Sequence, residues 1–254
     1  MKLKFKNTIS VLIKRILNIF ELSVLLLIFF FYLFRSYGVQ TVITHQLTNY
    51  VNNELDIDVV IKGVKLKSFK NFELNEILIP DLYGDTIVYI PEIKINLEQI
   101  KIINNEYIIN NLTIKDAQFN IRKKKNSEEY DYEYLLRNLK NNPETKNAPL
   151  SLEIKSLILD NCSFSHVNEE NLSNSKHIDF QSFKLIKLKS LFKNISLTKN
   201  YLLTDIIHLS FLENSGFTLS DLNAKIILDS TKISVAQLNI STNNSSINSK
   251  NLDY

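Results

Sequence analysis

The sequence predicts a mainly β protein. We expect an N-terminal transmembrane helix and a short amphipathic helix, followed by a long twisted antiparallel β-sheet, a β-groove, with one short inserted helix. Three observations support this: one long apolar run near the N-terminus, alternating apolar and polar residues beyond Asp56, and only four Gly and four Pro in 254 residues. Few turn-forming residues suit a long sheet better than a compact barrel with many tight corners.

The apolar run covers residues 16–34 and contains one charged residue, Glu21. Its nineteen residues would make a helix of roughly 28 Å, close to the hydrocarbon thickness of a bilayer. A cleaved signal peptide and a buried core helix are the alternatives; Phe34–Gly38 is a poor cleavage site, and the run has no polar face. We therefore predict an uncleaved signal-anchor helix over 16–35. Its membrane-facing residues would be Leu22, Leu25, Leu26, Leu27, Ile28, Phe29, Phe30, Phe31, Leu33 and Phe34.

Positive charges predict the orientation of this helix. Short flanks rich in Lys and Arg stay in the cytoplasm, and residues 1–15 form such a tail. Residues 1–35 carry six basic and one acidic residue, a net of +5, which leaves 24 basic and 26 acidic residues, a net of −2, beyond them. The exported part gives no support for nucleic-acid binding. The orienting residues are Lys2, Lys4, Lys6, Lys14 and Arg15.

Two further regions follow the span. Residues 36–56 place apolar side chains at spacings of three and four, which predicts an amphipathic helix. Residues 57–254 alternate with period two in many short segments, such as Val59-x-Ile61 and Val64-x-Leu66, which predicts antiparallel strands with one apolar face. A hairpin turn is expected at Tyr83–Thr86.

Residues 122–149 interrupt the alternation. The basic run Arg122–Lys125 is followed within three positions by acidic residues, so a solvated hairpin tip is favoured over a lipid-headgroup or nucleic-acid site. Tyr132 to Leu139 carries apolar residues at helical spacing and predicts the short inserted helix.

One local pattern occurs three times. Ile77-x-Ile79-x-Asp81, Leu112-x-Ile114-x-Asp116 and Leu157-x-Leu159-x-Asn161 are separated by 35 and 45 residues, and the latter two have a Phe three positions on. The pattern indicates repeated sheet growth in which each unit pairs mainly with its neighbours.

No catalytic, cofactor or metal site is expected. The four histidines are scattered, and there is no nucleophile elbow, phosphate loop or dinucleotide fingerprint. The single cysteine, Cys162, lies at an alternating position and is interpreted as a small core residue rather than a nucleophile.

The order of these segments resembles the N-terminal part of the TamB proteins, within the AsmA-like group of Gram-negative envelope proteins. The residues that carry the resemblance are Ile57–Gly63, the strand and turn Ile77–Thr86, and the strand pair Leu112–Phe119 followed by a polar tip and a Tyr-rich helix. Phe217–Ile247 resembles a later repeat unit. Family members are much longer, so the chain would be the first segment of a groove or work with other subunits.

The resemblance implies an inner-membrane-anchored, non-enzymatic periplasmic protein without cofactors. Its rolled sheet would contact phospholipid acyl chains, support phospholipid transport toward the outer membrane or assist outer-membrane protein assembly, with an outer-membrane assembly protein as a possible partner. A scaffold or chaperone that captures client strands at an open sheet edge and an ordinary β-sandwich are the alternatives. The candidate apolar groove face consists of Ile79, Ile95, Leu97, Ile114, Phe119, Leu159 and Phe164.

Overall fold

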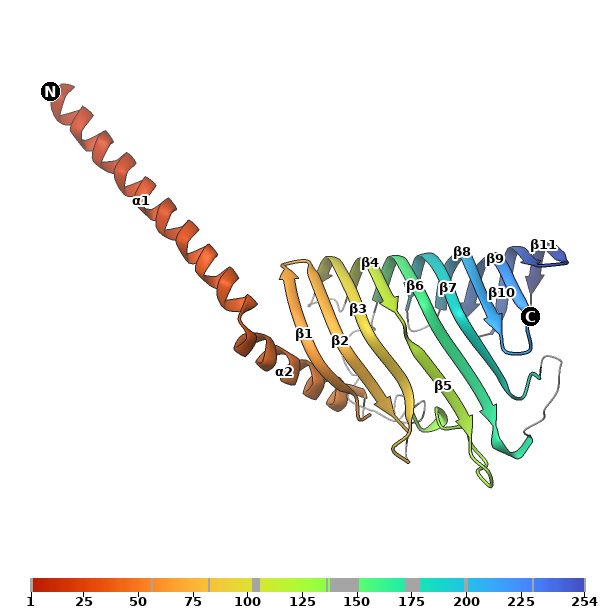
Figure 1. Cartoon of the computed structure of the whole chain (residues 1–254). Helices are drawn as coiled ribbons and strands as arrows, with labels where there is room; N and C mark the ends of the chain where they lie inside the picture. Colours follow the sequence, from red (N-terminus) through yellow and green to blue (C-terminus); the bar gives the residue numbers. More distant parts are fainter. Residues whose placement is uncertain are drawn as a thin grey trace.

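The structure is a computed structural model (Figure 1). It describes residues 2–55, 57–81, 83–101, 106–135, 137, 151–171, 179–198, 201–229 and 231–253, without the side chains of residues 2–14, 31, 34, 54 and 55. Helix α1 spans Lys2–Arg35 and helix α2 spans Tyr37–Leu55. Ser36 lies between them, and its carbonyl oxygen accepts a hydrogen bond from the Gln40 amide at 3.1 Å.

The protein is mainly β, with 62% strand, and its strands form one eleven-stranded sheet. Starting from β1, the order is β2, β3, β4, β6, β7, β8, β9, β10 and β11, with β5 paired to β3 and β6. A single sheet does not match the sandwich alternative. The bounds are β1 Val60–Ser68, β2 Asn71–Pro80, β3 Thr86–Lys101, β4 Glu106–Lys115, β5 Gln118–Lys123, β6 Ser151–Asn168, β7 Phe183–Leu197, β8 Tyr201–Glu213, β9 Thr218–Asp229, β10 Ile233–Thr242 and β11 Ser246–Asp253.

Strands β4 and β5 lie end to end between β3 and β6, and together they act as one long strand. The pairings β3–β4, β4–β6, β6–β5 and β5–β3 therefore close a ring of four strands, with the other seven outside it. Because β4 and β5 are consecutive pieces separated by two residues, this ring is a split within one strand of the continuous sheet seen in Figure 1.

The expectation of a wholly antiparallel sheet is wrong at one place. Both β4 and β5 pair with β6 in parallel, whereas the other pairs are antiparallel. The physical reason is the long connection between Lys123 and Ser151, which carries the chain back to the end of the sheet where β4 began.

This parallel seam aligns two copies of the repeated sequence pattern. Leu112 lies beside Leu157, Ile114 beside Leu159, and Phe119 beside Phe164. The side-chain amide of Asn161 donates to Oδ1 of Asp116 at 2.6 Å. The two copies are thus neighbours in register, as expected for units that pair with each other.

A crease crosses the sheet between the two halves of its long strands. Glu76, Asp116, Asn161 and Lys187 have φ of 49°, 54°, 55° and 53°. The register places Pro91 between Glu76 and Asp116, and Asn161 beside Asp116. Proline in a central strand is tolerated at such an irregularity, where its missing N–H breaks no ladder bond. We call these five residues the crease.

The crease changes which face the side chains occupy. Residues three apart normally lie on opposite faces of a strand. Yet Leu74 and Ile77, which flank Glu76, belong to one apolar cluster, as do Ile114 and Ala117. The same holds for Leu159 and Cys162 around Asn161. One face of the sheet is consequently apolar on both sides of the crease.

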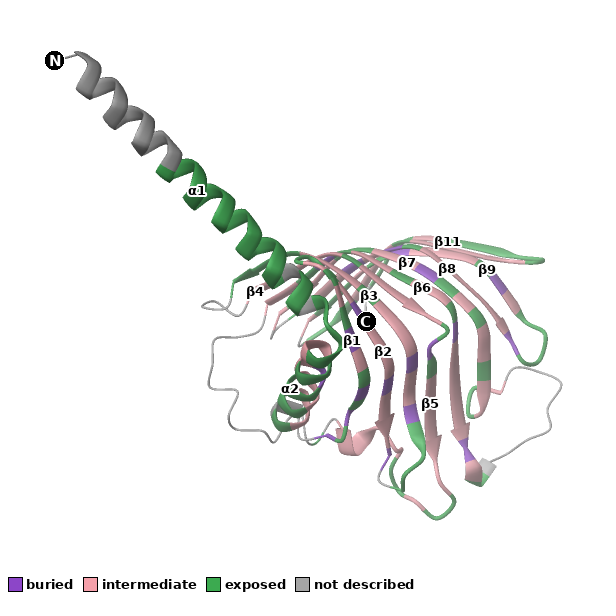
Figure 2. Ribbon diagram, turned by 60° about the vertical axis from the view of Figure 1, so that its left-hand side comes forward, coloured by how far each residue is buried: buried purple, intermediate pink, exposed green. Residues whose placement is uncertain are grey.

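The apolar core lies at the β1 end of this face, where α2 packs against the sheet (Figure 2). The predicted amphipathic helix is therefore present, with His45 on its exposed side. Its buried stripe is narrower than expected, because Val42 is 60% exposed. The buried cluster comprises Ile57, Val59, Ile61, Val64, Ile77, Ile90, Ala117 and Cys162, and the α2 side chains packed on it are Ile43, Leu47 and Val51.

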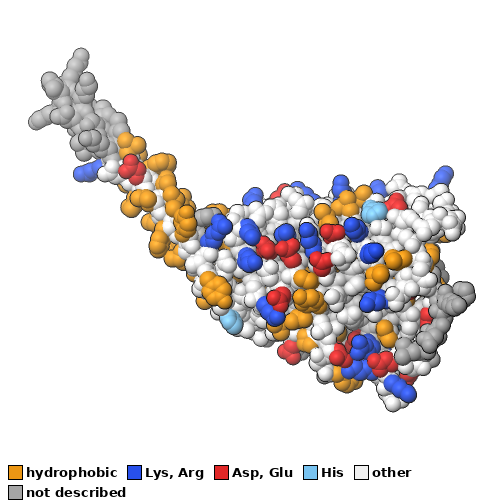
Figure 3. Space-filling model, in the orientation of Figure 1, with side chains coloured by type: hydrophobic (Ala, Val, Ile, Leu, Met, Phe, Trp, Pro, Cys, Tyr) orange, Lys and Arg blue, Asp and Glu red, His pale blue; other side chains and the backbone are white. Residues whose placement is uncertain are grey.

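Helix α1 projects from the sheet, and its described apolar side chains are exposed (Figure 3). Within the described residues, no helix meets the length and apolarity needed to cross a membrane. The span predicted for residues 16–34 includes Phe31 and Phe34, whose side chains lie outside the described part, as do those of Lys2, Lys4, Lys6 and Lys14. The span and its orientation stay predictions.

Candidate apolar groove

The seven predicted groove residues are all half-buried. Ile79, Ile114, Phe119 and Leu159 pack against the core cluster. Phe164 lies two residues beyond Cys162 of that cluster, and its ring centroid is 5.9 Å from that of Phe183. These five are brought together on the apolar face.

The other two residues lie farther from the core. Ile95 is two residues beyond Ile93 and therefore shares its apolar face. Leu97 pairs with Ile109 next to a register shift, so its face does not follow from alternation. The seven positions thus occupy one end of the sheet rather than the length of a groove.

Sequence reasoning missed a longer feature, which we call the apolar row. Ile95 has Phe72 and Leu112 as its cross-strand partners. From Leu112 to Ile206, each member of the row pairs with an apolar residue on the next strand. Six inter-strand spacings of about 4.8 Å give this row a length of about 29 Å. Its first five members are half-buried and the last two are buried. The members are Phe72, Ile95, Leu112, Leu157, Phe192, Ile206 and Ala224.

A hollow of about 340 Å³ lies beside the start of this row, and most of its lining residues, such as Lys94 and Thr113, belong to the opposite, polar face. Phe72 and Ile95 line it together with polar residues, including Lys67 and Glu73. Lys67 Nζ lies 2.9 Å from a Glu73 carboxylate oxygen, and its hydrogen bond lowers the pKa of that carboxyl. The remaining lining residues are Asn71, Asn96 and Asn111.

Ion pairs lie at or beside the crease on the opposite, polar side. Lys62 pairs with Glu76, Lys94 with Glu92 at 2.9 Å, and Lys189 with Asp160 at 3.8 Å. Figure 3 shows such basic and acidic side chains gathered in a band over the sheet. The two faces therefore differ sharply in polarity.

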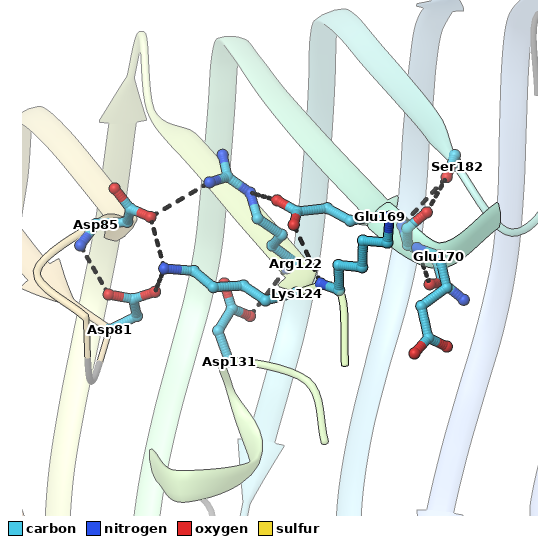
Figure 4. Close-up of polar contacts among 10 residues, drawn as sticks. Asp81, Asp85, Arg122, Lys124, Asp131, Glu169, Glu170 and Ser182 are labelled. Carbon is cyan, nitrogen blue, oxygen red and sulfur yellow. Dashed lines mark hydrogen bonds and ion pairs between the residues drawn. The ribbon is translucent and has the colours of Figure 1, made fainter. Parts of the chain in front are cut away.

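The basic run at 122–125 is not a solvated tip throughout, which corrects the sequence-based expectation. Arg122 and Lys123 belong to β5, and four carboxylates from neighbouring segments pair with the run, including Glu170 with Lys123 at 3.8 Å (Figure 4). Arg122 lies 3.3 Å from Asp85 and 3.7 Å from Glu169, while Lys124 lies 3.1 Å from Asp85 and 3.8 Å from Asp81. Cations already paired in this way offer little to a phosphate.

Asp81 organises the turn beside this cluster. Its side chain is 1% exposed, and Oδ1 accepts hydrogen bonds from the amides of Tyr83 at 2.8 Å and Asp85 at 2.7 Å. Gly84 supplies the left-handed backbone, with φ of 87°. The predicted turn at residues 83–86 is confirmed, and Asp81 acts as its structural centre.

Part of the connection between β5 and β6 covers the core cluster on the apolar face. Tyr134 and Leu135 pack against the core cluster, and the Tyr134 hydroxyl donates to the Pro80 carbonyl oxygen. Residues 133–135 and 137 are helical, while residues 136, 138 and 139 of the predicted helix lie outside the described residues.

Cys162 is 1% exposed within the core cluster. Burial raises the pKa of its thiol, so the reactive thiolate is disfavoured. This agrees with the interpretation of Cys162 as a small core residue.

One hydrogen-bonded row of chemistry-bearing residues was not expected. His208 Nδ1 lies 2.6 Å from Asp221 Oδ1, and His208 Nε2 lies 3.0 Å from Ser210 Oγ. The order resembles a nucleophile, base and orienting acid. These residues lie where the β8–β9 register passes from Ile206–Ala224 directly to Phe211–Leu219, so their side chains bridge a stretch in which the two strands are not paired. We interpret the row as a polar cross-strand cluster.

Among the described residues, no group of His, Cys, Asp and Glu is arranged to hold a metal ion. Neither a protein-family model nor a curated protein matches this chain.

Proposed function

We propose that the protein is an inner-membrane-anchored, non-enzymatic envelope protein of the TamB/AsmA type. In this proposal its periplasmic sheet contacts phospholipid acyl chains and supports their transport toward the outer membrane, or the assembly of outer-membrane proteins. The observation that carries the proposal is the apolar row, which runs along the sheet perpendicular to its strands.

The dimensions of the row suit hydrocarbon chains. Its length of about 29 Å equals the hydrocarbon thickness of a bilayer, or about two acyl chains end to end. Each methylene removed from water contributes about 0.8 kcal/mol. Half-buried floor residues such as Leu112 and Leu157 still have apolar surface to cover.

Membrane attachment is supported by the sequence of residues 16–34 and by the exposure of its described side chains. Leu25 and Leu27 are each 63% exposed, and Phe29 is 59% exposed. Large apolar side chains exposed on successive turns favour contact with lipid. The basic tail ending at Arg15 favours a cytoplasmic N-terminus and a periplasmic sheet.

Photo-crosslinking in cells tests this proposal. A small aliphatic diazirine residue is introduced at Ile95, Ile114 or Leu159, and adducts are identified by mass spectrometry. Phospholipid adducts are expected at these apolar-face positions. The matched controls are the preceding residues Lys94, Thr113 and Ile158, which point to the other face and pair with one another in register.

Equal lipid capture at both sets of positions would contradict a directional groove, and adducts with protein alone would refute the lipid proposal. The second candidate, capture of client strands at a sheet edge, is favoured by β11, which pairs with β10 alone among the described strands. Proline substitutions along β11 should then abolish client capture and leave lipid adducts at Ile95 unchanged.

A further inference from the structure

We propose that α2 is a displaceable plug that occupies the membrane-proximal end of the apolar groove and regulates lipid entry there. This inference rests on the proposed lipid-binding function. Ile43, Leu47 and Val51 of α2 lie on the floor of the sheet where an acyl chain would otherwise lie. Their branched alkyl side chains present the same hydrocarbon chemistry as that ligand.

Two specific hydrogen bonds hold α2 against β1. Thr44 Oγ1 accepts a hydrogen bond from the Val64 amide at 2.9 Å, and Asn52 Oδ1 accepts one from the Val59 amide at 2.9 Å. Both amides lie along the edge strand or just before it, so α2 also covers the edge of the sheet. Among the described residues, these hydrogen bonds and a narrow apolar stripe form an attachment that lipid can compete with.

The helix also has an alternative surface to contact. Val42 lies on its outer side and is 60% exposed, and α2 follows the apolar helix α1 in the chain. The break at Ser36 separates the two helices, and Ser36 Oγ faces the Val39 amide at the start of α2. A released α2 can therefore rest at the membrane interface with its apolar residues in lipid while α1 stays in place.

The test compares lipid capture at a position near the plug with capture at a position beyond it. Leu74 packs against the core cluster at the α2 end, whereas Ile95 lies farther along the apolar face. The diazirine residue is placed at either position in the full-length protein in membranes. Thr44→Val and Asn52→Ala, separately and together, remove the two hydrogen bonds.

Loss of either acceptor is expected to raise the fraction of the protein in which α2 is released from the sheet. The yield of phospholipid adducts at Leu74 should rise with it, about tenfold. Adducts at Ile95 should stay the same. The matched controls are Thr41→Val and Asn53→Ala, which make the same changes on exposed positions of α2. Unchanged capture at Leu74 with normal capture at Ile95 would overturn the plug and leave the proposed function standing.

Absence of lipid adducts at Ile95 in every variant would refute the proposed function, and the plug with it. A second variant covers the case in which the released forms do not fold. Val42→Asn changes an exposed side chain, leaves the core intact and disfavours the interface-bound state. It is expected to lower adducts at Leu74 severalfold, and an unchanged or increased yield would overturn the inference.

Discussion

Because Lys187 of the crease has a left-handed backbone, we predict that replacing it by glycine stabilises the protein. Lys187 lies in β7 with φ of 53° and is exposed. Left-handed backbone costs a residue with a Cβ about 1–2 kcal/mol. Glycine loses about 0.5–1 kcal/mol in conformational entropy relative to alanine. The difference predicts that Lys187→Gly raises the free energy of unfolding by about 0.5–1 kcal/mol.

Lys184 provides the matched control in the same strand. It is also exposed, but its φ is not in the left-handed region. Lys184→Gly should lower the free energy of unfolding by about 0.5–1 kcal/mol, because only the entropic cost applies. Urea unfolding of the full-length protein in detergent micelles, followed by far-UV circular dichroism, measures both changes. Equal destabilisation by the two substitutions would refute the reasoning.

Asn161 shows why Lys187 is the cleaner position. Asn161→Gly relieves a similar backbone conformation, with φ of 55°, but removes the 2.6 Å hydrogen bond from Asn161 to Asp116. That bond contributes about 0.5–1.5 kcal/mol. The two effects nearly cancel, so Asn161→Gly is expected to change the free energy of unfolding little.

Three further predictions concern buried polar groups. Asp81→Ala should lower the free energy of unfolding by about 2–3 kcal/mol, because two amide donors lose their charged acceptor. In the same urea unfolding, the control Asp85→Ala should lower it much less, since Asp85 is mainly exposed. Burial raises the pKa of the Asp131 carboxyl, so the folded protein favours its protonated form. The stability that this form contributes is fully present below the unfolded-state pKa and is lost as pH rises through the folded-state pKa. Asp131→Asn keeps an acceptor for the Arg122 amide and should be more stable than the wild type at pH 7, with the difference vanishing below about pH 4 in a pH series of unfolding curves. Cys162 should react with a maleimide only at denaturant concentrations that unfold the sheet, and rapid labelling of the native protein would contradict its place in the core.

The sequence was informative about local patterns and less so about how they join. Val59-x-Ile61 and Val64-x-Leu66 were recognised as alternating pieces, and the structure joins most of them into one continuous strand, β1. The spacing between Ile61 and Val64 carried the signal for the crease, since the same three-residue spacing recurs in neighbouring strands. Alternation alone does not predict the crease from this spacing, because residues three apart in a regular strand lie on opposite faces.

The parallel seam could not be derived from local sequence. Strands on either side of it alternate in the same way as antiparallel strands, and only the path of the crossover decides their direction. The repeated Leu-x-φ-x-Asp/Asn pattern, with φ an aliphatic residue, did contain a clue. Equivalent residues of two copies, such as Leu112 and Leu157, lie side by side only if their strands run parallel and in register.

Part of the candidate site could likewise be predicted. The groove residues from Ile79 to Phe164 were chosen by alternation, and five of them share the apolar face. Alternation does not predict that the apolar row extends to Phe192 and Ile206. Their cross-strand partners depend on register shifts, which alternation does not reveal. The hydrogen bonds of His208 with Ser210 and Asp221 lie where the β8–β9 register is interrupted, which alternation does not reveal either.

The crease also connects the fold to the proposed function. Without a left-handed residue at Asn161, Leu159 and Cys162 would lie on opposite faces of β6 and the apolar surface would end halfway along the strand. With it, both halves of each long strand contribute to one floor. Irregularities of this kind also bend the strand, so the same residues that keep the floor apolar give it curvature. The curvature of the apolar floor thus follows from a local backbone conformation repeated in neighbouring strands.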